Sequence, residues 1–149
     1  INFDLFSSIE FVVRKGLFDV LNGNITYDGS NVPVYNVVPD NASYPYIIIY
    51  SVSTNSIEEN KSKFITDVET RLEVVTRFSS SSGGQLQANK IINSISQLII
   101  LKSGLLNLTS SSFNVYSQVN NGITYLTEDL PDHTYYRGVL GMSVKLEQL

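Results

Sequence analysis

Apolar positions recur with a helical spacing in two parts of the chain, and each part predicts a helix. Between residues 3 and 21 the apolar residues lie three and four positions apart, which indicates one buried helix face. Asn22 and Gly23 then provide a stop, because both residue types tolerate the left-handed conformation that ends helices. A second stripe over residues 85–101 predicts an amphipathic helix that covers a sheet, and the Ser/Gly linker at 79–84 also suits a helix N-cap.

The chain between these two helices begins with turn chemistry and short strand patterns. We expect a loop with an Asp-Gly turn at 24–31, then a short strand at 32–38 in which Pro33 favours the strand start or a sheet edge. The continuous β-branched and aromatic run at 46–53 is typical of a strand buried on both faces. The polar residues 53–63 that follow are either an exposed loop or the tip of a long hairpin.

The clearest strand pattern lies at residues 66–78, where two sets of side chains alternate strictly. The inward set is mostly apolar or Thr: Thr66, Val68, Thr70, Leu72, Val74, Thr76 and Phe78. The outward set is mostly charged: Asp67, Glu69, Arg71, Glu73, Val75 and Arg77. Because strand side chains have a period of two, one face is expected to be buried and the other charged. The charged face is either solvated or pairs across a subunit boundary.

The last third of the chain predicts two further strands. A weaker pattern at 108–119 is followed by a turn at 120–122, an acidic loop at 128–133 and a final half-buried strand at 136–146. Because these strands are segregated from the two helices, the expected class is α+β. We predict a mostly antiparallel sheet of about five strands packed with two amphipathic helices, in a single domain over residues 1–149.

Composition then narrows the classes of function. The 149 residues correspond to about one domain, and a hydrophobic share of 42% argues against disorder of the whole chain. A net charge of −4 argues against an electrostatic grip on nucleic acid. The absence of Cys excludes thiolate chemistry, and a single His leaves little room for zinc or triad chemistry. No stretch reaches the roughly 18 to 20 apolar residues of a membrane helix, so we expect no membrane partner.

Candidate chemistry is sparse. One carboxylate-rich cluster could bind a hard cation but lacks the spacing of a calcium loop: Glu128, Asp129, Asp132 and His133. Glu58 and Glu59 form an acid–base pair only in a cleft that raises one pKa, and they lie in a segment expected to be exposed. The Ser/Gly run at 79–84 lacks the Gly-Lys-Ser/Thr ending of a phosphate-binding loop. We therefore expect no enzyme activity, no cofactor and no metal.

The order of the motifs resembles a known family more closely than any single motif does. A short strand leads to a Tyr-Pro-Tyr-Ile opening of a buried strand at 44–47, and a long amphipathic strand follows at 68–78. The second helix comes next at 85–101, and the chain closes with Tyr-Arg-Gly-Val-Leu at 136–140. In this order the chain resembles the tail-completion or tail-terminator proteins of tailed bacteriophages.

That resemblance implies a mechanical role. Identical subunits would close a homo-oligomeric ring of about six or twelve copies around the DNA exit channel, with head-to-tail contacts between them. The ring would lie in the virion at the head–tail junction, after synthesis in the host cytoplasm. It would contact portal or adaptor proteins and tail proteins, while DNA would pass transiently and without specific binding.

The sequence does not fix which residues form the subunit interface, and it also permits a second function. The candidate interface residues are off-stripe aromatics and charges: Phe11, Phe18, Glu58, Glu59, Lys61, Glu69, Arg71 and Glu73. The alternative is a non-catalytic small-ligand or glycan-binding α+β module, which would use the nine Tyr residues as its contact surface.

Overall fold

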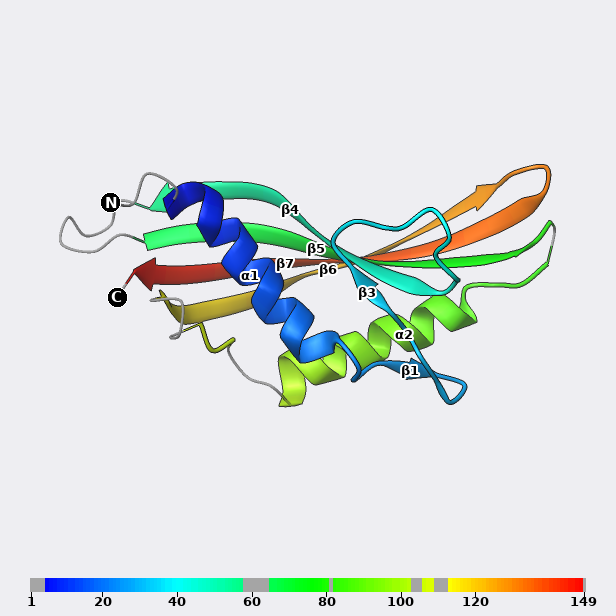
Figure 1. The fold of residues 1–149 in the computed structure, drawn as a ribbon, viewed down its shortest axis with the longest axis horizontal. Coiled ribbons are helices and arrows are strands. Elements are labelled where there is room, and N and C mark those ends of the chain that lie inside the picture. Colours follow the sequence, from blue (N-terminus) through cyan, green and yellow to red (C-terminus); the bar gives the residue numbers. More distant parts are fainter. Residues whose placement is uncertain (1–4, 58–64, 81, 103–105, 109–112, 149) are drawn as a thin grey trace.

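The chain forms one long twisted sheet with both helices on the same face (Figure 1). The computed structural model describes residues 5–57, 65–80, 82–102, 106–108 and 113–148. The helices are α1 (Leu5–Leu21) and α2 (Leu86–Ser96), and α2 continues as a π-helical segment, η1 (Gln97–Lys102). The main strands are β3 (Val34–Tyr35), β4 (Tyr46–Ile57), β5 (Ile65–Ser79), β6 (Phe113–Asp129) and β7 (His133–Gln148).

The five main strands are arranged in the order β3-β4-β5-β7-β6. Only the short β3–β4 pairing is parallel, and β4–β5, β5–β7 and β6–β7 are antiparallel. The predicted α+β class, with two helices and a mostly antiparallel five-stranded sheet, is therefore confirmed.

The core lies between the sheet and the helix layer. The predicted alternation of β5 is confirmed, because Val68, Leu72 and Val74 are fully buried on the helix-facing side. Val144 and Leu146 of β7 continue this apolar layer. Val75 is the exception to the pattern, since it is also fully buried although it belongs to the opposite face.

The predicted first helix is confirmed, and polar contacts fix α1 to the strand next to it. Ile9, Val13, Leu17 and Leu21 form its buried stripe, which matches the three-and-four spacing. Arg14 donates a hydrogen bond of 2.7 Å to Ser51 Oγ, and Thr54 Oγ1 donates to Glu10. The helix ends before Gly23, which adopts the expected positive φ of 79°. These contacts hold α1 across β4.

The second helix is also present, but two details of its start differ from the prediction. Gln85, not a residue of the 79–84 linker, is the N-cap residue, and it makes no side-chain capping bond. Leu86 was expected on the apolar stripe and is instead 62% exposed, because it lies at the first helical position beyond the edge of the packed face. Ile91, Ile92 and Ile95 are buried as predicted.

The segments flanking β3 contain two corrections. The predicted loop at 24–31 is a small hairpin of β1 (Thr26–Tyr27) and β2 (Ser30–Asn31), and Asp28 and Gly29 at its turn both have positive φ. The prediction that 46–53 is buried on both faces is wrong. Ile47 and Ile49 are buried against the helices, while Ile48 and Tyr50 on the opposite face are half-buried, because no second helix layer covers them within the described ranges.

The alternative of a long hairpin at 53–63 is confirmed up to the point where the described residues end. Strand β4 continues to Ile57 and pairs with β5, including Ile57 opposite Ile65. The remainder of that segment lies outside the described residues.

The largest correction concerns β6. The turn predicted at 120–122 is instead a β-bulge, and the strand runs through it from Phe113 to Asp129 in register with β7. Asn and Gly favour both features, since each tolerates positive φ, and Gly122 has a φ of 110°. The real turn follows Leu130, whose N–H donates to His133 O at 2.9 Å. The predicted acidic loop is therefore partly strand.

Candidate functional site: the open sheet face and its projecting hairpin

The sheet face opposite α1 and α2 is here called the open face, because no described helix packs on it. A row of Cα partners crosses its centre from β4 to β6: Tyr50, Arg71, Gly141 and Gly122. The two glycines lack side chains, and they leave a groove of about 420 Å³ at this point. Glu69, Glu73, Val139 and Thr124 stand along the rows on either side.

The charges around the groove are paired within the chain. Arg137 lies 3.0 Å from Glu73 and 3.6 Å from Glu128, which ties β7 to both neighbouring strands. Arg71 lies 3.9 Å from Glu69, at the long limit of an ion pair. Three of the predicted interface residues, Glu69, Arg71 and Glu73, are thus brought together on the open face, where they form a surface of mixed sign.

At one end of the sheet, β6 and β7 project as a hairpin beyond the helix layer (Figure 1). The outer half of β6 exposes large apolar side chains, including Ile123 (39%), Tyr125 (38%) and Leu126 (50%), and Leu130 at the turn is 44% exposed. In the inner half of the same strand Phe113 is only 3% exposed. Ile123 and Tyr125 stand on the helix-facing side, opposite Leu140 and Gly138, whereas Leu126 stands on the open face opposite Arg137. Clustered exposed apolar side chains are characteristic of a contact surface.

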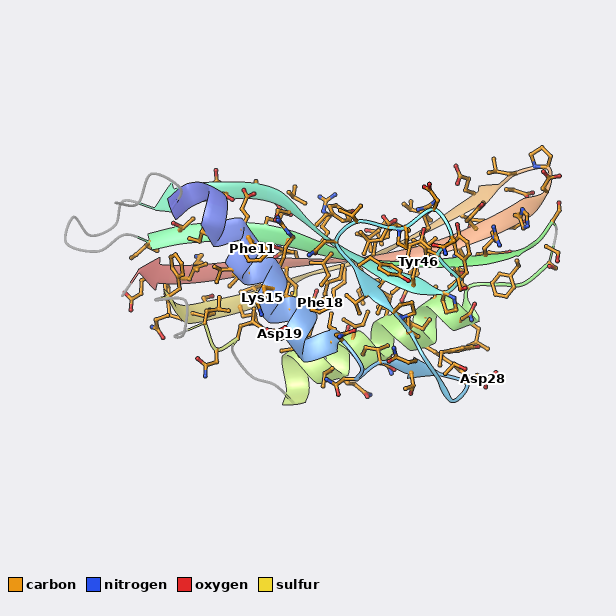
Figure 2. The ribbon with its side chains drawn as sticks, viewed as in Figure 1. Phe11, Lys15, Phe18, Asp19, Asp28 and Tyr46 are labelled. Atoms are coloured by element: carbon orange, nitrogen blue, oxygen red, sulfur yellow. The ribbon has the colours of Figure 1, made fainter. Side chains whose placement is uncertain are left out.

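The other predicted interface residues do not join this surface. Figure 2 shows Phe11 and Phe18 on α1, in the helix layer. Phe11 is 50% exposed, whereas Phe18 is partly buried and packs against the core cluster. Glu58, Glu59 and Lys61 lie outside the described residues. The predicted set therefore spans both layers and does not form one continuous patch.

The hairpin residues were missed by the sequence reasoning although a signal was present. Ile123, Tyr125 and Leu126 stand in a β-rich run between Gly122 and Glu128. The turn predicted at 120–122 and the acidic loop predicted at 128–133 leave this run between them with no predicted strand. If Asn120-Asn121-Gly122 forms a bulge, the run at 123–127 continues the preceding strand. That strand then has more apolar residues than one buried face needs.

Tyrosines close one end of the open face by packing on one another. The ring of Tyr44 lies 5.0 Å from that of Tyr46 and 5.9 Å from that of Tyr135, and the Arg77 guanidinium is stacked 4.3 Å above Tyr44. Desolvation, followed by contacts with Tyr46 and Tyr135, raises the pKa of Tyr44 to about 12. These rings anchor the segment before β4 onto the open face.

The acidic cluster considered for metal binding is engaged in other contacts. Asp129 Oδ1 accepts a hydrogen bond of 2.7 Å from Thr134, and Glu128 faces Arg137. Across the described ranges no three His, Cys, Asp or Glu residues gather in a way that could hold a metal ion.

Among the residues that the structure describes, no helix is both long and apolar enough to span a membrane.

No protein-family model matches this chain, and a search of curated proteins also gives no match.

Proposed function

We propose that this chain is a structural subunit that assembles head to tail into a homo-oligomeric ring. The observation that carries the proposal is the projecting hairpin, whose Ile123, Tyr125 and Leu126 expose apolar surface that the chain's own core does not use. Covering such a surface is favourable at about 25 cal/mol per Å² of apolar area. A closed assembly of identical subunits gives every copy the same cover.

We further propose that the ring is a head–tail junction component of a tailed bacteriophage, with portal or adaptor proteins and tail proteins as its neighbours. The support is the resemblance of motif order, from the Tyr-Pro-Tyr-Ile segment at 44–47 to the Tyr-Arg-Gly-Val-Leu segment at 136–140. The open face fits a wall along which DNA slides, since its charges are neutralised within the chain and the net charge is −4.

Native mass spectrometry combined with negative-stain electron microscopy of the purified chain tests the ring. We expect one closed copy number, near six or twelve, whose population increases with protein concentration. A chain that stays monomeric up to its solubility limit would contradict the proposal. A monomer that binds glycans in the groove next to Tyr50 and Arg71 would instead support the ligand-binding alternative.

The phage assignment has its own test, because a ring is not unique to phages. Incubating the purified protein with tailless phage heads or with unterminated tails should yield complexes in which the ring occupies one end of the tail. If rings form but attach to neither particle, the assembly proposal stands and the phage assignment fails.

A further inference from the structure

The sheet has two open edges on opposite sides. Strand β6 ends the order β3-β4-β5-β7-β6, and among the described residues no strand pairs with its outer edge. On the other side β3 covers only Ile47 and Ile48 of β4. The remainder of β4, from Ile49 to Ile57, has no strand beside its outer edge within the described ranges.

The ladder geometry shows which β6 backbone groups face outward. Leu130 N donates to His133 O, so this pair is hydrogen-bonded across the hairpin. Because hydrogen-bonded and non-hydrogen-bonded pairs alternate in an antiparallel ladder, Ile123, Tyr125 and Thr127 direct their N–H and C=O groups away from β7. The close side-chain contact between Asp129 and Thr134 agrees with this phase, since side chains approach more closely at non-hydrogen-bonded pairs.

Both edges carry little of the usual protection against pairing. Soluble proteins guard exposed edges with Lys, Pro, bulges or short strands. The bulges of β6 lie before Ile123, and its outer segment from 123 to 129 contains no Lys and no Pro; its charges are Glu128 and Asp129, both next to the turn. Strand β4 has no charged residue along its whole length, and a single bulge at Val52 interrupts it.

The two edges also match in direction. Each of the steps from β4 to β5, to β7 and to β6 is antiparallel, so β4 and β6 run in opposite directions. Through the registers, Ile49 lies level with Ile123 and Tyr46 with Leu126, so the free part of β4 is displaced along the strands from the outer β6 segment. Copies related by rotation about an axis inclined to the strands therefore bring the β6 edge of one against the free β4 edge of the next as an antiparallel pair. This contact joins unlike surfaces, and each copy offers one of each, as a closed ring requires.

We infer that the outer edge of β6 pairs with the outer edge of β4 in a second copy of this chain, which makes one continuous sheet through the assembly. This inference rests on the proposed ring and names its interface. A second copy fits better than a foreign peptide because a peptide would occupy one edge and leave the other open, whereas an identical copy occupies both at once. The pairing also covers the exposed apolar side chains of the outer β6 segment.

Two single substitutions test the pairing, one designed to block the β6 edge and the other to block the β4 edge. Thr127→Pro removes an N–H that faces outward and keeps the bonds to β7, as proline is tolerated on the free side of an edge strand. Val52→Lys places a charge at the exposed bulge of β4. The matched controls are Thr127→Val and Val52→Thr, which retain the N–H and the β-branched shape. Should Thr127→Pro fail to give wild-type circular dichroism, Thr127→Lys replaces it.

We expect native mass spectrometry to show rings for the wild type and both controls, and single copies for each blocked variant. Mixed in equal amounts, the two blocked variants should form a heterodimer, because one copy keeps an intact β4 edge and the other an intact β6 edge. Val52→Lys alone forming a homodimer would show β6–β6 pairing and overturn the inference. Blocked variants that still form rings would overturn the edge pairing but leave the ring itself intact. A wild type that never forms rings would overturn both.

Discussion

The two halves of β6 are similar in apolar character but differ in their surroundings. In the inner half Phe113 and Val115 are 3% and 6% exposed and belong to the core cluster with Leu106 and Leu108. In the outer half Leu126 is 50% exposed, and the strand projects past the helix layer (Figure 1). The pairing with β7 is continuous through both halves apart from the bulges.

The comparison teaches that apolar residues of the same strand can contribute very differently to the core. The inner half stabilises the fold by removing apolar area from water, and its side chains are part of one close-packed core. The outer half adds little to that core, and in the proposed assembly its apolar residues would contact a second copy. Substitutions in the two halves should therefore separate stability from assembly.

The largest expected effect is on the inner half. Phe113→Ala should lower the free energy of unfolding by about 3–5 kcal/mol, because a buried ring is lost and a cavity remains. Leu126→Ala should change it by less than about 0.5 kcal/mol, since that side chain is half exposed. Urea unfolding followed by circular dichroism measures both under conditions where the protein is monomeric. Equal losses from the two substitutions would contradict the division of β6.

The two faces of β7 provide a second contrast of smaller size. A Cβ at Gly138 would lie 2.8 Å from Ile92 of α2, so Gly138→Ala should cost about 1–3 kcal/mol through overpacking. At Gly141, on the open face, a Cβ would meet only Asn121 Cβ at 3.6 Å, an ordinary contact. Gly141→Ala should therefore leave the thermal midpoint unchanged or raise it. Calorimetry of the two variants checks this, and a greater loss at Gly141 would show that the open face is packed.

A smaller effect is expected for the charges of the open face. Glu73→Gln removes the negative charge that lies 3.0 Å from Arg137, both partly buried, and should cost about 0.2–1 kcal/mol. The loss should decrease in high salt, because screening already weakens the wild-type pair. Unfolding at low and high ionic strength measures the difference. Glu69→Gln is the matched control, since its 3.9 Å contact with Arg71 contributes less.

The smallest effect concerns the tyrosine cluster and appears only at alkaline pH. The pKa of Tyr44 is raised to about 12 in the folded chain, so the unfolded chain loses this proton first, near the ordinary value of about 10. The stability that depends on neutral Tyr44 is complete below pH 10 and falls as the pH rises from about 10 to about 12. In Tyr44→Phe this part of the alkaline decline should be absent. Urea unfolding across that pH range compares the two proteins.

Local periodicity was sufficient to predict most of the fold. The alternation of β5 and the buried stripes of both helices follow from spacing alone, and the structure confirms them except at Val75 and Leu86. The prediction failed where the same short sequence is compatible with two local structures. Asn120-Asn121-Gly122 suits a turn and a bulge equally, and only the register with β7 distinguishes them.

Placement in space is the part that the sequence could not supply. The alternation of β5 located Glu69, Arg71 and Glu73 on one face, but the groove also needs Gly122 and Gly141 from distant strands. Likewise, the exposure of the outer β6 half depends on where α2 begins relative to the hairpin. Such relations arise from tertiary packing and leave no local pattern in the chain.

Hydrogen exchange measured with and without assembly tests the central claim most directly. The backbone amides of Ile123, Tyr125 and Thr127 should exchange rapidly in dilute monomer and become protected in the ring, as should the β4 amides that face outward. The inner β6 amides that donate to β7 should change little, because that ladder already protects them in the monomer. An assembled protein in which the outer half of β6 remains as unprotected as in the monomer would contradict the account.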